Sequence, residues 1–313
     1  MMENDDYELL DSGDGRKLER FGKYVLARPC SQALWRPSLG AHEWEKADAT
    51  FDREDGNRWH GRTNLPKEWT ISTAGIRFRL GGTDFGHLGI FPEQRSQWKW
   101  IREKVCSLQL AVGSCQDQEQ ASMNHAASFE GQRSCPTANC KLQTANSPRV
   151  LNLFAYSGGS TMAAALGGAE VCHLDASKGM VEWARANAAL NGLADKPIRW
   201  IVDDAHKFMK REIRRGRRYD AVILDPPTFG RGACGEMYKI ERDLKETLSL
   251  VKELLSDTPL FVLFSSHTPG LSPIVAQNIL SQLFPGAQTE SGEMLLEGRA
   301  LPCPSGIFCR AVF

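Results

Sequence analysis

The second half of the chain alternates between short apolar runs and segments of helical period, and this alternation constrains the fold more than any other feature. The apolar runs occupy 150–154, 170–174, 198–202, 219–224 and 260–264. Between them, 178–190 is typical of the helical segments: its apolar residues recur every three to four positions and Asn191-Gly192 caps its end. Repeated β-α units require right-handed crossovers, so they predict a parallel sheet covered by helices on both faces.

The other expected elements complete this sheet. We expect further helices at Ser160–Leu166, Ala205–Arg215, Met237–Leu255 and Pro273–Leu283. Two final runs, around Met294–Leu296 and Ile307–Phe313, predict an antiparallel hairpin at one edge. The fold class is therefore α/β, with a Rossmann-like sheet of seven strands.

The first part of the chain has a different pattern. Tyr24–Arg28 and Ile76–Leu80 read as strands, and little else there has helical period, so 1–84 is predicted to be a small β-rich domain. Residues 85–106 form a connecting segment with a helix from Arg95 to Val105. The polar stretch 107–148 is expected to be a flexible insertion before the α/β domain at 149–313.

Composition excludes some classes of protein. The formal net charge is zero, so a nucleic-acid partner would need a local basic patch. The acidic start is not a targeting peptide, and no apolar run approaches the length of about 18 residues that a membrane helix needs. Nine cysteines without paired C-x-x-C spacing argue against a disulfide scaffold or a metal site, and a cytoplasmic protein is expected.

The ends of the strands carry the candidate site, because ligands of such sheets bind beyond the carboxyl ends of the strands. A turn with Gly158-Gly159 follows the first strand, and we expect it to let the backbone approach a ligand closely. The G-x-G-x-x-G fingerprint is absent, which disfavours a dinucleotide-binding dehydrogenase.

Acidic residues follow three successive strands. Asp175 is placed to accept hydrogen bonds from ribose hydroxyls, and a carboxylate of Asp203-Asp204 from an adenine amino group. For each residue alone, a helix N-cap is an equally good interpretation. Three acids beside a glycine turn suit a cationic adenosyl ligand better than a pyrophosphate.

Asp225-Pro226-Pro227-Thr228-Phe229 is the sharpest motif. It follows an apolar strand, and its proline pair stiffens the loop and removes two backbone donors. The carboxylate and nearby carbonyls are then acceptors toward a planar nitrogenous target, on which Phe229 could stack. The alternative is a rigid loop with an N-capping Asp.

These motifs together resemble one family, the class I methyltransferases related to the bacterial large-subunit ribosomal RNA methyltransferases I and K. The segments that carry the resemblance are Phe85–Gln94, Leu151–Gly159, Asp175–Lys178, Asn187–Leu193 and Asp225–Phe229. The resemblance covers about Asp84–Ile101 and Arg149 to the end of the chain. It implies the methyltransferase form of the seven-stranded sheet, S-adenosylmethionine as methyl donor, and no metal.

The resemblance also implies roles for particular residues. The expected cofactor-binding residues are Gln94, Arg95, Asn152, Phe154, Ala155, Tyr156, Gly158, Asp175, Ala176, Asp204 and Asp225. The residues expected to face the methyl acceptor and act in catalysis are Asp225, Pro226, Pro227 and Phe229.

The absence of a Cys at one position limits which atom can receive the methyl group. Methylation of pyrimidine carbon 5 needs a Cys nucleophile. Cytosine-methylating relatives carry this Cys after the fifth strand, where this chain has Ser265-Ser266-His267. Cys234 is the only substitute nearby, and a free loop thiol is the simpler interpretation. A nitrogen acceptor needs no covalent step, so a base nitrogen in RNA, flipped out of its stack, is the expected target.

RNA also requires phosphate contacts. The basic residues Lys207, Lys210, Arg211, Arg214, Arg215, Arg217 and Arg218 surround one expected helix, although a solvated helix face explains them equally well. The N-terminal part adds a basic and aromatic group made of Arg53, Arg58, Trp59, His60 and Arg62. The expected function is RNA methylation at nitrogen, within rRNA processing. Methylation of a protein or small molecule, and a non-catalytic module for RNA assembly, stay open, as does the oligomeric state.

Overall fold

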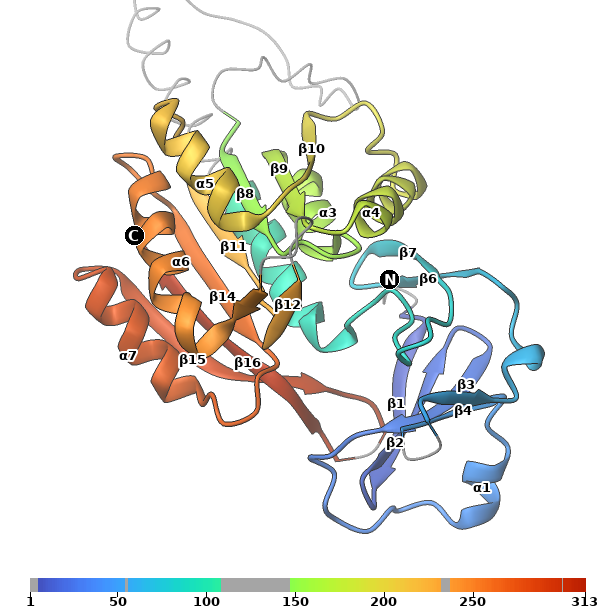
Figure 1. Ribbon diagram of the computed structural model, residues 1–313. Helices are drawn as coiled ribbons and strands as arrows, with labels where there is room; N and C mark the ends of the chain where they lie inside the picture. Colours follow the sequence, from blue (N-terminus) through green and yellow to red (C-terminus); the bar gives the residue numbers. More distant parts are fainter. Residues whose placement is uncertain (1–4, 54–55, 108–146, 232–236, 300) are drawn as a thin grey trace, which may run out of the picture.

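The chain folds around a mixed sheet of seven strands (Figure 1). The computed structural model describes residues 5–53, 56–107, 147–231, 237–299 and 301–313. The strands of this sheet are β8 (Arg149–Leu153), β9 (Glu170–Asp175), β10 (Ile198–Val202), β11 (Ala221–Leu224), β14 (Phe261–Ser266), β15 (Gln288–Leu296) and β16 (Cys303–Val312). Each expected strand of the second half is present, and the expected α/β class is confirmed.

Strand order fixes where a ligand can bind. The order is β10-β9-β8-β11-β14-β16-β15, and the first five strands of this order are mutually parallel. β16 runs antiparallel to both β14 and β15, so the expected terminal hairpin forms one edge. The chain moves outward in one direction from β8 to β10 and then returns to the other side of β8 with β11. The carboxyl ends of β8 and β11 therefore form the switch point, where a crevice opens between the crossover connections.

Helices cover both faces of the sheet, each over its own apolar core. One face packs α3 (Gly159–Leu166), α4 (Lys178–Leu190) and the helix at 95–107. The other face packs α5 (Ala205–Arg214), α6 (Ile240–Leu254) and α7 (Pro273–Leu283). Figure 1 shows α5, α6 and α7 along one side of the sheet and α3 and α4 toward the other.

One helix boundary differs from the sequence expectation. The helix expected from Met237 begins at Ile240, because Met237–Lys239 forms β13, a strand paired with β12 (Phe229–Arg231). Tyr238 and the apolar helix residues share a hydrophobic pattern that does not mark this change of secondary structure.

The N-terminal part is rich in β-structure, as expected. Its five-stranded sheet has the order β1-β2-β3-β4-β5. The elements are β1 (Tyr7–Gly13), β2 (Arg16–Phe21), β3 (Tyr24–Pro29), α1 (Ala41–Glu45), β4 (Ala49–Asp52), β5 (Arg58–His60) and the short η1 (Arg62–Asn64). A separate hairpin follows, made of β6 (Trp69–Thr73) and β7 (Ile76–Leu80).

Two sets of contacts tie the N-terminal part to the large sheet. The backbone of Leu9 in β1 accepts from the amide of Arg299 at 2.9 Å, beyond the end of β15. The side chains of Asn187 in α4 and of Asn191, its C-cap, accept from the backbone amides of Arg79 and Arg77 in β7, both at 2.8 Å. The β6–β7 hairpin is thus fastened to α4 as well as to its own end of the chain.

The domain boundaries at residues 84, 106 and 148 stay predictions. Most of the insertion expected at 107–148 lies outside the described residues. None of the helices that are described has the length and apolar character needed to cross a membrane.

Candidate active site

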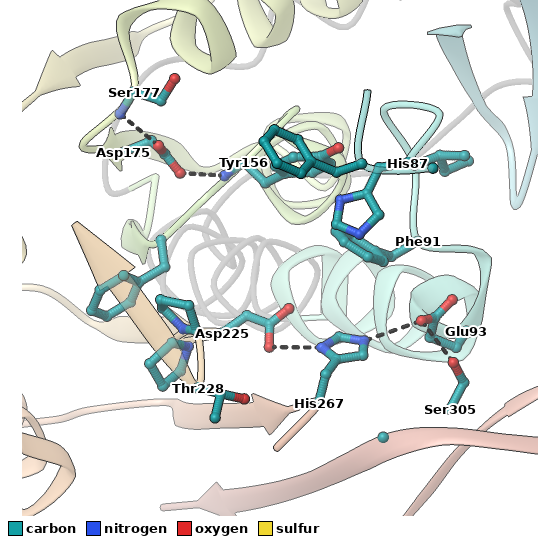
Figure 2. A pocket seen from close by; sticks show the side chains of 18 of the residues that line it. His87, Phe91, Glu93, Tyr156, Asp175, Ser177, Asp225, Thr228, His267 and Ser305 are labelled. Carbon is teal, nitrogen blue, oxygen red and sulfur yellow. Dashed lines mark hydrogen bonds and ion pairs between the residues drawn. The ribbon is translucent and has the colours of Figure 1, made fainter. Parts of the chain in front are cut away.

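A cavity of about 640 Å³ lies at the switch point of the sheet (Figure 2). Residues after β8, β9, β10 and β11 line one part of it, and the N-terminal sheet and the start of β16 close the other. The sequence predicts cofactor binding for Phe154, Tyr156, Asp175, Ala176 and Asp204, so we call the first part, which these residues form, the donor side. It predicts that Asp225, Pro226 and Pro227 face the methyl acceptor, so we call the second part, which they form with Glu93 and His267, the acceptor side.

The turn after β8 shapes the donor side. Phe154 and Tyr156 both adopt left-handed backbone conformations, with φ of 54° and 50°, which residues other than glycine rarely adopt. Both side chains line the cavity. Such conformations persist only where surrounding contacts hold them, and they concentrate at functional sites.

Asp175 supplies one of those contacts. Its Oδ2 accepts from the amide of Tyr156 at 2.9 Å, and its Oδ1 accepts from the amide of Ser177 at 2.8 Å. Burial raises the pKa of Asp175, while these two amides act in the opposite direction. Each oxygen keeps lone pairs beyond the amide contact, so the carboxylate can still accept from ligand hydroxyls. Ser177, rather than Asp175, is the N-cap of α4.

The two glycines of the turn lie close to protein atoms. A Cβ on Gly159 would lie 2.6 Å from the ring of Trp98, and a Cβ on Gly158 would lie 3.0 Å from Cβ of Ala184. Gly158 also has a φ of 88°. Trp98 and Ala184 therefore pack closely against the turn, and the close approach of a ligand expected there stays a prediction.

Asp204 is both a helix N-cap and a cavity residue, the two positions that the sequence allowed. It is the N-cap of α5, since its Oδ1 accepts from the amide of Lys207 at 2.9 Å. It also lines the cavity, together with Ala176 and Asp203. The neighbouring Asp203 forms an ion pair with Arg211 of α5, which neutralises one charge at this end.

Asp225 is anchored by Gln94, the last residue of the 3-10 helix η2 (Pro92–Gln94). The side-chain Nε2 of Gln94 donates to Oδ2 of Asp225 at 3.1 Å and to Oγ of Ser265 at 3.0 Å. Oδ1 of Asp225 is buried and has no hydrogen-bond partner among the described residues. Nδ1 of His267 lies 3.5 Å from this oxygen, close enough for an ion pair.

His267 is a functional candidate that sequence reasoning did not identify, and Glu93 was expected at the site only as part of the segment Pro92–Arg95. Nε2 of His267 lies 3.1 Å from Oε1 of Glu93, and Oγ of Ser305 donates to the same oxygen at 3.0 Å (Figure 2). Burial opposes the charged ring, but Asp225 and Glu93 outweigh it and raise the pKa of His267 to about 10. Burial alone would raise the pKa of Glu93, but His267 holds that pKa at about 2. The one available signal was the position of His267 directly after a buried strand.

Aromatic rings form a wall between the two sides. The ring of Phe91 lies 5.0 Å from that of Tyr156 and 5.2 Å from that of His267, measured between centroids. His87 packs on the edge of the same Phe91 at 5.4 Å. Across the cavity, Tyr238 of β13 lies 5.3 Å from Phe154.

Several residues predicted for the site lie outside this lining. They are Gln94, Arg95, Asn152, Ala155, Gly158 and Phe229. Gln94 donates a hydrogen bond to Asp225 without lining the cavity itself. Arg95 forms an ion pair with Asp5 at 3.0 Å. Asn152 is buried in β8, where its amide donates to Thr161. Phe229 is 58% exposed, with the ammonium group of Lys239 5.4 Å from its ring.

Comparison with known proteins gives matches over this region and beyond. A family model described as S-adenosylmethionine-dependent methyltransferase matches residues 138–273. The crystal structure of the SAM-dependent methyltransferase from Agrobacterium tumefaciens is similar over 98% of this chain and 90% of that one. Its TM-score is 0.81 and its sequence identity 34%.

Curated relatives match a shorter stretch. Ribosomal RNA large subunit methyltransferase K of Neisseria meningitidis serogroup B is 32% identical over 145 residues, which is 45% of this chain and 40% of that protein. Ribosomal RNA large subunit methyltransferase K/L of Shewanella baltica is 37% identical over 118 residues, which is 37% of this chain and 16% of that protein. The matched region thus spans less than half the length of either relative.

The cavity lies at the switch point of the sheet and is lined by carboxylates that follow the strands. Together with the similarity along nearly the whole Agrobacterium chain, these features define one class of protein. The chain belongs to the S-adenosylmethionine-dependent methyltransferases. It is an enzyme that uses S-adenosylmethionine as methyl donor, as the sequence resemblance implied.

Proposed function

We propose that this methyltransferase modifies a nitrogen of a base in RNA, with ribosomal RNA as the first candidate. The observation that carries the proposal is the Asp225-Pro226-Pro227 loop, which lines the cavity directly beside the donor side. The names of the Neisseria and Shewanella relatives support RNA as the substrate class. A cytoplasmic location, expected from the sequence, stays a prediction.

The donor side fits an adenosyl group in its chemistry. Asp175 has lone pairs left for ribose hydroxyls, and Asp204 offers an acceptor for the adenine amino group. Phe154 and Tyr156 offer aromatic surface in the same wall. We assign cofactor binding to these residues and to Ala176. The cofactor roles expected for Gln94, Arg95, Asn152, Ala155 and Gly158, which lie outside the lining, stay predictions.

On the acceptor side, Asp225 accepts an N–H of the base, and the two prolines keep the loop rigid around it. When bound, S-adenosylmethionine supplies an electrophilic methyl group. The protein's task is then to place the acceptor nitrogen in line with that group and to exclude water, and positioning of this kind can supply several kcal/mol of the barrier. Phe229, on the exposed hairpin beside the loop, is proposed to stack on the target nucleotide.

We propose a nitrogen rather than pyrimidine carbon 5 as the methyl acceptor because of where the cysteine thiols lie. Among the cysteines in the described part of the chain, Cys30 alone lines the cavity, and its Sγ contacts Sγ of Cys303 at 3.2 Å. This thiol follows β3 of the N-terminal sheet rather than β14. Cys234, the substitute that the sequence offered, lies outside the described residues.

The rim of the cavity supports an RNA partner. Phe85, 75% exposed, and Arg53 both line it from the N-terminal part of the chain. An exposed aromatic ring with a nearby cation is a common platform for unstacked bases. The basic cluster of α5 supports RNA less strongly, because Lys210, Arg211 and Arg215 are engaged by acidic side chains.

The experiment offers tritiated S-adenosylmethionine to the protein with total RNA, protein extract and small metabolites in separate reactions. We expect label in RNA, and mass spectrometry of the digested nucleosides should place the methyl group on a base nitrogen. Label only in protein or metabolites would refute the proposal. Label at pyrimidine carbon 5 would refute its choice of atom, and a Cys30→Ser variant would then show whether that thiol is the nucleophile.

A further inference from the structure

Three charged side chains from distant segments meet on the acceptor side. Glu93 belongs to the 3-10 helix η2 (Pro92–Gln94), Asp225 follows β11, and His267 follows β14. The imidazole lies between the two carboxylates, 3.1 Å from Glu93 and 3.5 Å from Asp225 (Figure 2). No motif of the sequence places these residues together.

Proton counting limits the state of this ring. A neutral imidazole has one N–H and one lone pair, so one of its nitrogens would direct a lone pair at a carboxylate oxygen. A ring protonated on both nitrogens donates toward both carboxylates and carries the charge that they attract. The raised pKa of His267, about 10, agrees with this geometric argument.

The neighbours of the ring include one aromatic side chain and one hydroxyl group. Phe91 packs against one face, and Ser305 of β16 donates to the same Glu93 oxygen that the ring contacts. The other charged groups acting on Glu93 and on the neighbouring His87 are Lys17, Arg28 and Arg53. These are cations, so the two carboxylates are the groups that favour a charged His267.

Asp225 gains its orientation from two directions. Gln94 holds Oδ2 with an amide hydrogen bond, while Oδ1 is buried with His267 as its nearest charged partner. Hydrogen bonds at catalytic sites are often long before the ligands bind and tighten afterwards. A shortening of the 3.5 Å contact by a few tenths of an ångström would make it a hydrogen bond.

We propose that His267 is a positioning residue of the methyl-transfer site, which Glu93 holds as an imidazolium and which fixes the Asp225 carboxylate toward the acceptor nitrogen. The ring keeps both protons throughout and takes no part in the transfer itself. Glu93 acts one step further away, by holding the ring. This inference rests on the proposed function in one respect, that Asp225 faces the acceptor.

The first test needs no substrate. The protein is labelled with ¹⁵N-histidine, and the ring nitrogens are followed by NMR from pH 6 to pH 10.5 in the wild type, Glu93→Gln and Asp225→Asn. The signal missing from His267→Gln identifies the residue. We expect a ring protonated on both nitrogens at pH 8 in the wild type, and a titration midpoint lowered by at least one pH unit in each of the other two variants.

The second test uses kinetics with the acceptor that carries the tritium label. We expect His267→Gln to lower kcat about 10- to 100-fold, since a small misplacement of a catalytic group costs this much. The Kd for S-adenosylmethionine, measured by calorimetry, should stay within about 3-fold of wild type, which also confirms that the variant folds. Glu93→Gln should lower kcat in the same direction. The matched comparison is His87→Gln, whose ring packs on the same Phe91 and has a lowered pKa, caused mainly by burial.

Two outcomes overturn the proposal. One is a His267 signal that titrates near pH 6.5 in the wild type. The other is a kcat in His267→Gln that stays within about 3-fold of wild type, or that falls no further than in His87→Gln. Failure of the RNA assignment would leave the NMR result intact, because that measurement involves no acceptor. The two failures are therefore distinguishable.

Discussion

The donor side and the acceptor side of the cavity are built in different ways. On the donor side, the Asp175 carboxylate is held by backbone amides of the turn after β8 and of its own loop. On the acceptor side, the Asp225 carboxylate accepts a hydrogen bond from the side chain of Gln94 and lies 3.5 Å from His267, and both residues come from other parts of the chain. One carboxylate is held by backbone amides, and the other lies among side chains that include an ionisable group.

This difference has a functional consequence. Backbone amides do not titrate, so the donor side should bind its ligand equally well at every pH at which Asp175, whose pKa burial raises, is ionised. A carboxylate held by an imidazolium depends on one proton, and on the packing that keeps Glu93 and His267 in place. The two sides should therefore fail separately, under different substitutions and different conditions.

The largest expected effect separates the two carboxylates. Asp175→Ala should weaken binding of S-adenosylmethionine about 100-fold, since a hydrogen bond to a charged group contributes about 1.5–3 kcal/mol. Asp225→Ala should leave that binding within a few-fold of wild type and lower kcat about 100- to 1000-fold. Calorimetry and initial rates with the labelled donor measure the two quantities. An Asp225→Ala protein that methylates at the full rate would end the role given to this residue.

The next effect is a pH dependence of stability. The pKa of His267 is about 10 in the folded protein and near 6.5 in an unfolded chain. Between these values the folded state holds a proton that the unfolded state has lost. The stability from this residue is therefore complete below about pH 6.5 and declines as the pH rises toward 10, by at most about 1.4 kcal/mol per pH unit.

Urea denaturation at pH 7, 8, 9 and 10 measures this decline. The difference in unfolding free energy between the wild type and His267→Gln should shrink as the pH rises. The same difference for His87→Gln should stay constant over this range, because burial lowers the pKa of that ring below 6.5. If the unfolding free energies of the wild type and His267→Gln change in parallel with pH, the charge of His267 does not stabilise the acceptor side.

A smaller effect tests the packing beneath the donor side. Gly159→Ala should destabilise the protein by about 1–3 kcal/mol, since its Cβ would lie 2.6 Å from the Trp98 ring. Gly179→Ala, at the start of α4, is the matched control because the nearest atom to its Cβ is 3.9 Å away. This control should be neutral or stabilising by up to about 1 kcal/mol. Equal stability of the two variants would contradict the view that Trp98 supports the turn.

The smallest effect concerns the rim of the acceptor side. Phe85→Ala should raise KM for RNA about 10-fold, since stacking of one base contributes about 1–3 kcal/mol. Phe229→Ala should raise it less, about 3-fold, because that ring lies outside the lining and contacts Lys239. Both rings are exposed, so neither change should shift the midpoint of urea denaturation noticeably. A larger effect of Phe229 than of Phe85 would move the RNA path toward the β12–β13 hairpin.

Much of the fold was predictable because its signals are local. The helices at Lys178–Leu190 and Pro273–Leu283 have the bounds that the sequence indicated, since each combines a clear apolar period with a capping residue. The strand β13 was missed because Met237–Lys239 continues the hydrophobic pattern of the helix after it. Only its pairing with β12 identifies it as a strand.

The site also has features that the sequence predicts and features that depend on tertiary contacts. The sequence by itself determined the class of enzyme and the places of Asp175, Asp204 and the Asp225-Pro226-Pro227 loop at the ends of strands, because strand ends and turns are encoded within a few residues. Tertiary structure alone decided that Gly159 accommodates Trp98 and that Glu93 and His267 surround Asp225. A side chain's charge state and orientation depend on neighbours brought from distant segments, and a linear pattern holds no record of those neighbours.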